Sequence, residues 1–369
     1  MNLQEQIGQL FMLGFDGTSV SPEWAEMQAR YKPGGMILFA RNLEDPAQII
    51  ELTNGLQARS PHSSLLIAID QEGGRVSRLP AGFTIFPPCG VIGACRSEEL
   101  AYAAAAVTAA ELRTVGVNMN MAPVLDVHSN PDNPIIGDRA YGTEPDIVAE
   151  LGLAAIRGLQ GKGVVACGKH FPGHGDTGTD SHKELPVVKA SRDILLDREL
   201  PPFRHAIANG LASIMTAHVV YPALDAQHPA TLSPAILTGL LRKQMGFDGV
   251  IVTDDLEMHA ISDHHGIGDA AVQAFLAGAD ILLICKDRDR AVAAMEAVRK
   301  AVESGIISPD RLDTSVRRIM RIKHTFLRSH LPADPSIAQL VVGCHTHHVL
   351  LDTIRRTHER MPKVDPHYP

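Results

Sequence analysis

The chain has 369 residues, of which 34 are Lys or Arg and 42 are Asp or Glu, so its formal net charge is −8. This balance argues against nucleic-acid binding, which requires a basic face. The first residues lack the basic and apolar regions of a signal peptide, and no apolar run reaches the ~18–20 residues of a membrane helix. The five scattered cysteines have no CxxC spacing and fit a reducing compartment. We therefore expect a cytoplasmic protein without a membrane partner.

Short apolar segments alternate with longer helical segments along almost the whole chain. The segments rich in β-forming residues are 10–15, 35–39, 65–69, 117–124, 164–167, 213–217, 249–252 and 280–284. Apolar residues three and four positions apart predict helices over 46–58, 97–115, 144–160, 234–245, 269–277 and 288–303. Continuous apolar strands that alternate with helices indicate parallel strands buried on both faces.

Eight such units predict an α/β fold, a single (β/α)8 barrel over residues 1–331. A doubly wound sheet is the alternative, but Gly73-Gly74 is not the G-x-G-x-x-G fingerprint of dinucleotide-binding sheets. Residues 332–369 form a His- and Pro-rich extension, which we expect to be a short helix or disordered. Its run from Cys344 to His348 allows a metal site, although a solvated segment or a packing helix is the favoured interpretation.

Polar side chains follow every predicted strand. In a barrel these positions meet at the carboxyl ends of the strands, where catalytic groups lie. Charges scattered at random over the surface would not fall so regularly at one end of each strand. The residues are Asp16, Arg41, Asp70, Asp126, Lys169, His170, His218, Asp254, Asp255 and Lys286.

The densest group of polar residues is the segment 169–182, KHFPGHGDTGTDSH. Asp180 precedes His182 by two positions, so its carboxylate can orient the imidazole and raise its basicity, as in an acid/base dyad. The glycines at 173, 175 and 178 predict a mobile segment that carries this dyad over a bound substrate. An exposed loop without a role is the alternative interpretation.

A carboxylate and several charged side chains complete the candidate site. Asp254 at the end of the seventh strand is placed to act as a nucleophile, although one of the two adjacent aspartates is equally suited to a hydrogen-bonding or helix-capping role. Asp70 can accept hydrogen bonds from sugar hydroxyls, while Arg78 and Arg139 offer forked donors. Ordinary salt bridges are an equally good interpretation of each of these residues taken alone.

A metal site is the main competing interpretation of the segment 169–182. His170, His174, Asp176 and His182 offer nitrogen and oxygen ligands. The first strand, however, lacks the His-x-His pair that barrel metallohydrolases carry, and a glycine-rich loop is a poor rigid support for ligands. We therefore expect no metal.

Three motifs resemble those of bacterial β-N-acetylglucosaminidases of glycoside hydrolase family 3, the type that acts in cell-wall recycling. They lie at 70–75, 169–182 and 240–254, and the resemblance extends from about residue 6 to residue 326. By this resemblance Asp254 corresponds to the nucleophile, His182 to the acid/base and Asp180 to its partner. The residues that correspond to those holding the N-acetylglucosamine ring are Asp70, Arg78, Arg139, Lys169 and His170.

The resemblance implies a retaining exo-enzyme that removes terminal N-acetylglucosamine from muropeptides through a glycosyl-aspartate intermediate. It implies a small carbohydrate or muropeptide partner and no cofactor, and a barrel of this size can work as a monomer. The alternatives are a phosphorylase that uses phosphate instead of water, a metal-dependent barrel hydrolase and a non-catalytic sugar-binding protein. Glu257 departs from the family pattern, in which a small residue is usual, and we expect it to narrow the leaving-group side of the site.

Overall fold

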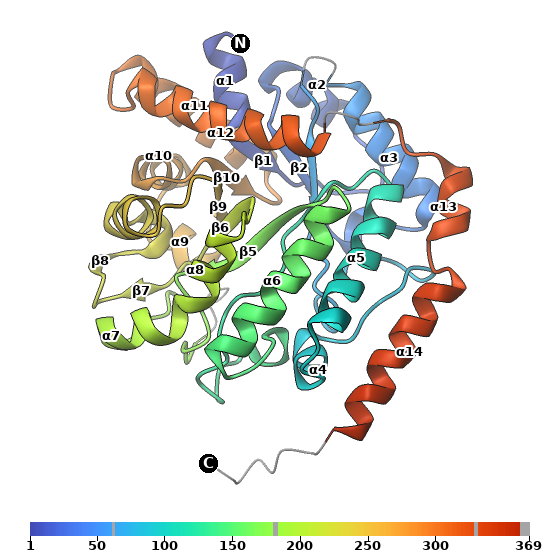
Figure 1. The fold of residues 1–369 in the computed structure, drawn as a ribbon. Helices are drawn as coiled ribbons and strands as arrows, with labels where there is room; N and C mark the ends of the chain where they lie inside the picture. Colours follow the sequence, from blue (N-terminus) through green and yellow to red (C-terminus); the bar gives the residue numbers. More distant parts are fainter. Residues whose placement is uncertain (61–62, 180–183, 328–330, 362–369) are drawn as a thin grey trace.

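Eight parallel strands form a closed barrel at the centre of the molecule (Figure 1). The structure is a computed structural model that describes residues 1–60, 63–179, 184–327 and 331–361. Around the barrel the strands run in the order β1–β10–β9–β6–β5–β4–β3–β2. They are β1 (Phe11–Leu13), β2 (Gly35–Leu38), β3 (Leu66–Ile69), β4 (Met119–Asn120), β5 (Val165–Phe171), β6 (Ser213–Thr216), β9 (Val250–Asp255) and β10 (Ile281–Ile284). The predicted (β/α)8 barrel is confirmed, and the open doubly wound sheet is wrong.

Helices surround the barrel (Figure 1). The α-helices before the fifth strand are α1 (Leu3–Gln9), α2 (Pro22–Tyr31), α3 (Pro46–Ala58), α4 (Cys89–Ala94), α5 (Glu98–Thr114) and α6 (Pro145–Gly161). Those after it are α7 (Arg192–Ile194), α8 (Pro201–Ala208), α9 (His259–Ser262), α10 (Ile267–Ala277), α11 (Arg288–Glu303) and α12 (Pro309–Leu327). Two π-helical segments are η3 (Leu195–Glu199) and η5 (Ala235–Gln244), and 3-10 turns form η1 (Ala40–Asn42), η2 (Gly137–Arg139) and η4 (Ala230–Leu232). The antiparallel pair β7 (Val220–Tyr221) and β8 (Asp225–Pro229) lies outside the barrel.

The observed elements follow the predicted ones closely, with two informative differences. Helices α3 and α11 have the predicted bounds, and Asp45 and Asp287 cap them by accepting hydrogen bonds from two backbone N–H groups each. The fourth strand was expected over 117–124 but pairs regularly only at Met119–Asn120, because Pro123 has no N–H to donate to a ladder. The fifth strand includes Lys169 and His170, which therefore project from a strand rather than follow it.

The C-terminal extension forms two helices, α13 (Pro335–Val341) and α14 (His345–Arg360), that pack outside the barrel helices (Figure 1). Helix α13 contacts α3 and α5, whereas α14 contacts α4 and α5. Asn54 of α3 holds the start of the extension, because its side chain donates to the carbonyl of Ala333 at 2.9 Å and accepts from its N–H at 2.8 Å. Within the described ranges, no helix combines the length and apolarity needed to cross a membrane.

Candidate active site

A cleft of about 390 Å³ opens at the carboxyl ends of the barrel strands. All the predicted sugar-holding residues and the predicted nucleophile line it, namely Asp70, Arg78, Arg139, Lys169, His170 and Asp254. The predicted dyad, Asp180 and His182, lies outside the described residues. The cleft volume is that of a site for a small molecule, and its walls also include Phe39, Arg41, Glu72, Met215, Asp255, Met258, Cys285 and Lys286.

Strand β9 ends in two aspartates that have different environments. Asp254 lines the cleft, and its Oδ1 accepts a hydrogen bond from the N–H of Asp255 at 2.8 Å. Asp255 accepts from the N–H groups of Glu257 at 3.1 Å and Cys285 at 3.3 Å. Burial, together with the charges of Glu257 and Asp254, raises the pKa of Asp255 to about 7. Asp255 thus ties β9 to the end of β10, while Asp254 presents a carboxylate on a rigid strand.

Lys169 is the centre of a buried ion network. Its Nζ lies 2.8 Å from Oδ1 of Asp70 and 2.7 Å from Oε1 of Glu72. Burial by itself lowers the pKa of Lys169, but the two carboxylates outweigh it and hold the pKa above the usual range. Lys169 is therefore a fixed cation, and its ammonium group retains one N–H beyond those given to these carboxylates.

Glu72 holds a second cation, Arg139, in a forked pair. The Nε and Nη2 atoms of Arg139 lie 2.8 Å from Oε2 and Oε1 of Glu72. Burial by itself raises the pKa of Glu72, but the charges of Lys169 and Arg139 hold it well below the usual range. A permanently charged carboxylate shared by two cations fixes the positions of both.

Arg78 lies between an aromatic ring and the carboxylate of Asp70. Its guanidinium carbon is 5.9 Å from the centre of the Phe39 ring, and its Nη2 is 3.8 Å from Oδ2 of Asp70. Gln71 accepts a hydrogen bond from the N–H of Arg78 at 3.0 Å and so fixes its backbone. The buried Nε of Arg78 has no hydrogen-bond partner within the described part of the chain. A buried donor in this state suits a hydroxyl group of a bound sugar.

His170 is oriented by a fully buried carboxylate, Asp126. Nδ1 of His170 lies 2.7 Å from Oδ2 of Asp126, and Oδ1 accepts from the N–H groups of His170 at 3.0 Å and His174 at 2.7 Å. In a neutral ring Nδ1 then carries the proton and Nε2 is the acceptor, and His170 itself lines the cleft. Asp126 is thus a support for His170 and does not itself line the cleft.

The candidate metal ligands of the segment 169–182 that the structure describes form contacts with other protein groups. Burial, with a contribution from His170, lowers the pKa of His174 to about 4, and its Nδ1 lies 2.9 Å from Oγ1 of Thr177. Asp176 forms an ion pair with Arg198 at 2.8 Å. No group of three or more His, Cys, Asp or Glu side chains among residues outside 61–62, 180–183, 328–330 and 362–369 is arranged to hold a metal ion.

The base of the segment 169–182 is packed tightly, which differs from the expected mobile hinge. A side chain at Gly173 would meet Glu199, and one at Gly175 would lie 1.6 Å from the carbonyl oxygen of Val127. The hydroxyl of Tyr221 also donates to the carbonyl of Gly173 at 2.6 Å. These two glycines therefore permit close packing, whereas a side chain at Gly178 would meet no atom of the described residues within 4 Å.

Glu199 is a buried acid beneath this segment. Its Oε1 accepts from Arg198 at 2.7 Å and Ser129 at 3.2 Å, whereas its buried Oε2 has no partner among the residues that the structure describes. Burial raises the pKa of Glu199 to about 7 and outweighs the charge of Arg198. The loop that leads to the predicted dyad thus rests on a carboxyl group that titrates near neutral pH.

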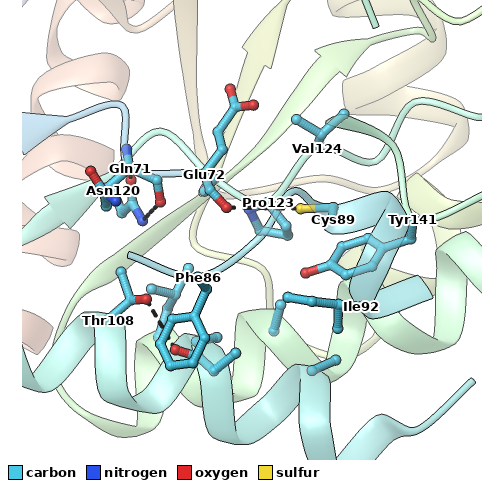
Figure 2. Close-up of a pocket in the computed structure, with 16 residues that line it drawn as sticks. Gln71, Glu72, Phe86, Cys89, Ile92, Thr108, Asn120, Pro123, Val124 and Tyr141 are labelled. Atoms are coloured by element: carbon cyan, nitrogen blue, oxygen red, sulfur yellow. Dashed lines mark hydrogen bonds between the residues drawn. The ribbon is translucent and has the colours of Figure 1, made fainter. Parts of the chain in front are cut away.

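A small cavity of about 40 Å³ lies behind the ion network, between the barrel and helices α4 to α6. Figure 2 shows Phe86, Cys89, Ile92 and Tyr141 around it, with the carboxylate of Glu72 pointing away from them. Burial raises the pKa of the Cys89 thiol to about 12, so this thiol is not a nucleophile at neutral pH. The cavity is a packing feature separate from the cleft.

Some residues predicted at the barrel mouth serve other purposes. His218 is buried and binds Oγ1 of Thr231 at 2.7 Å and the carbonyl of Asp255 at 2.9 Å. Asp16 pairs with Arg41 at 2.7 Å on the rim. Glu257 is absent from the cleft lining, and its carboxylate accepts from the N–H of Lys286 at 2.7 Å just before α11, so the expected narrowing of the leaving-group side stays a prediction.

Glu72 is the principal site residue that the sequence reasoning missed. It stands two positions after Asp70, within the motif 70–75, but only Asp70 ends the predicted strand. The signal that points to it is charge balance, because Lys169 and Arg139 are both buried cations and Asp70 alone does not neutralise two of them.

A model of the glycosyl hydrolase family 3 N-terminal domain matches residues 2–322. Beta-hexosaminidase A of Pseudoalteromonas piscicida is 39% identical over 89% of this chain, and beta-hexosaminidase of Nitrosomonas eutropha is 44% identical over 76% of it. The chain covers 59% of the length of the first relative and 81% of the second. The structure is similar to that of a glycoside hydrolase family 3 beta-N-acetylglucosaminidase from Paenibacillus, with a TM-score of 0.94 and 45% identity over 97% of this chain and 69% of that one.

Proposed function

Because this chain belongs to glycosyl hydrolase family 3, we propose that it is an exo-acting β-N-acetylglucosaminidase that removes terminal N-acetylglucosamine. The observation that carries the proposal is the cleft itself. It combines a strand-borne carboxylate, Asp254, with a fixed array of charged donors and acceptors around Lys169 and Glu72. Such an array suits the several hydroxyl groups of one sugar ring.

The proposed reaction is a retaining double displacement. Asp254 attacks the anomeric carbon and forms a glycosyl-aspartate, while His182 protonates the departing glycosidic oxygen. A water molecule that gives its proton to His182 then attacks the same carbon and restores the free Asp254 carboxylate. Asp180 stabilises the imidazolium, and the proton transfer contributes about 10²–10⁴ in rate. The sequence signature of the segment 169–182 supports these roles for the dyad.

The residues around the cleft hold the sugar in this proposal. Asp70 accepts from hydroxyl groups, while Arg78 and Lys169 donate to them with the N–H groups that remain after their protein contacts. His170 and Arg139 complete the binding surface, and the ties of both to buried carboxylates support a rigid arrangement.

We propose muropeptides as the natural substrates, with cell-wall recycling in the cytoplasm as the role and a monomer as the working form. The resemblance of the three motifs to recycling enzymes supports this proposal. Turnover of N-acetylglucosaminyl-anhydromuramyl peptides compared with chitin oligosaccharides tests it. A kcat/KM higher for the chitin oligosaccharides would overturn the muropeptide assignment while leaving the reaction type intact.

The central experiment is hydrolysis of an aryl N-acetyl-β-glucosaminide beside the aryl β-glucoside. We expect clear preference for the N-acetyl substrate, and preference for the glucoside would overturn the proposal. A fluorinated N-acetylglucosaminide should leave a covalent adduct on Asp254, as located by peptide mass spectrometry. The same assay in phosphate buffer should release free sugar, whereas sugar 1-phosphate as the main product would identify a phosphorylase.

A further inference from the structure

A buried carboxylate on α5 joins the C-terminal extension to the segment that follows Arg78. Glu111 is 1% exposed, and it accepts four hydrogen bonds. Two come from Thr84, from its hydroxyl at 2.7 Å and its N–H at 2.9 Å. The other two come from the extension, from the N–H of Gly343 at 2.9 Å and Nδ1 of His347 at 2.7 Å.

The extension also touches this segment directly. Gly343 has a φ of +59°, and a side chain there would lie 2.1 Å from the carbonyl oxygen of Gly82. Both the backbone conformation and the close approach require glycine at this position. The turn between α13 and α14 therefore packs against the segment from Gly82 to Thr84.

The segment 79–86 continues without a break into the sugar-binding residues. At one end, Gln71 accepts from the N–H groups of Arg78 at 3.0 Å and Leu79 at 3.3 Å. At the other end, the carbonyl of Phe86 accepts from the N–H of Gly74 at 2.9 Å. The middle of the segment is held by the contacts of Thr84 and Gly82 with Glu111 and the extension, so these contacts limit the freedom of Arg78.

We propose that Glu111, Gly343 and His347 form a clasp that positions the segment 79–86 and thereby Arg78 for sugar binding. The inference rests on the proposed function, because it assumes that Arg78 contacts the sugar. These three are positioning residues, since none of them lines the cleft. A loosened segment must be ordered again each time substrate binds, which weakens binding without changing the chemical step. The clasp thus sets KM and leaves kcat nearly unchanged.

The test compares His347→Ala with His345→Ala, an exposed histidine of the same helix that makes no contact with Glu111. Gly343→Ala is a second, independent disruption. In His347→Ala and Gly343→Ala we expect KM for an aryl N-acetyl-β-glucosaminide to rise about 3–10-fold, the range that corresponds to the net contribution of one typical hydrogen bond. We expect kcat to stay within about twofold, and His345→Ala to match the wild type in both.

Two further measurements separate the clasp from simple stabilisation and from the proposed function. Hydrogen exchange of the amides in 79–86 should accelerate in both variants, and the Kd of free N-acetylglucosamine should rise in proportion to KM. Lower thermal stability with unchanged exchange, KM and Kd would overturn the clasp. If the wild type does not hydrolyse the aryl substrate, the proposed function fails. The Kd of N-acetylglucosamine and the hydrogen exchange of 79–86 then still test whether the clasp positions this segment. A wild type that does not bind N-acetylglucosamine overturns both.

Discussion

Lys169 and Glu72 form a buried ion pair at the floor of the cleft, with Nζ 2.7 Å from Oε1 and both side chains at most 3% exposed. Neither residue is isolated, because Lys169 also pairs with Asp70 and Glu72 also pairs with Arg139. The chain of charges balances two cations against two carboxylates. Removing one member of such a buried set leaves a charge without its partner, which costs more than the pair contributes.

Glu72→Gln should therefore both destabilise the protein and weaken catalysis. We expect the free energy of unfolding to fall by about 3–5 kcal/mol, because Lys169 and Arg139 then share one fewer negative charge in a buried site. Urea denaturation measures this loss, and kcat/KM should fall as the two cations move. Glu98→Gln, at an exposed position at the start of α5, is the matched control. Equal stability of the two variants would contradict the structural role of Glu72.

Asp254→Asn should abolish most activity, whereas Asp255→Asn should not. Asp254 lines the cleft and is the proposed nucleophile, and loss of such a group costs at least about 10³ in kcat. Asp255 accepts backbone hydrogen bonds through Oδ1, which an asparagine carbonyl also accepts. Steady-state hydrolysis of the aryl N-acetyl-β-glucosaminide compares the two variants. A greater loss of kcat in Asp255→Asn than in Asp254→Asn would mean that Asp255, and not Asp254, is the nucleophile.

The sequence predicted the barrel because short apolar segments, typical of buried parallel strands, alternate with helical segments. Both patterns can be recognised from residues that are close together in the chain. It also placed Lys169, His170 and Asp254 at one mouth, since the ends of parallel strands meet there. It did not predict the roles of Glu72 and Glu111, because the cationic partners of Glu72 lie 67 or more positions away and the partners of Glu111 lie 27 to 236 positions away in the chain. Nothing local distinguishes a glutamate that binds two distant cations from one that faces solvent.

Glu199 should make the stability of the protein fall as pH rises through neutrality. An ordinary glutamate has a pKa of about 4.3, whereas burial raises the pKa of Glu199 to about 7 in the folded chain. Between these values the folded state holds a proton that the unfolded state has lost, so stability decreases with increasing pH. This contribution is complete below about pH 4 and is lost as pH rises through 7.

Glu199→Gln should remove that dependence, because the amide stays neutral at every pH. Thermal denaturation from pH 5 to pH 9 should show a smaller fall in Tm for this variant than for the wild type. Asp197→Asn, an exposed acid in the same π-helical segment, should behave like the wild type. Identical pH profiles for Glu199→Gln and the wild type would show that the acid is already ionised at pH 5.

Gly175 and Gly178 should respond very differently to alanine, although they lie three residues apart in the same loop. A side chain at Gly175 collides with the carbonyl of Val127, where two backbones are in contact and neither can yield easily. Gly175→Ala should shift the residues that lead to Asp180 and His182, so we expect kcat to fall at least tenfold, about the cost of a modest misplacement of catalytic groups.

Gly178→Ala meets no described atom within 4 Å, and its cost is limited to backbone freedom. We expect its kcat to stay within about threefold of the wild type, unless Gly178 is the hinge of a moving loop. The two variants therefore separate packing from motion: a loss confined to Gly175→Ala shows that tight packing places the dyad. A large loss of kcat in Gly178→Ala, without a change in Tm, would instead establish the hinge that the glycine spacing first suggested.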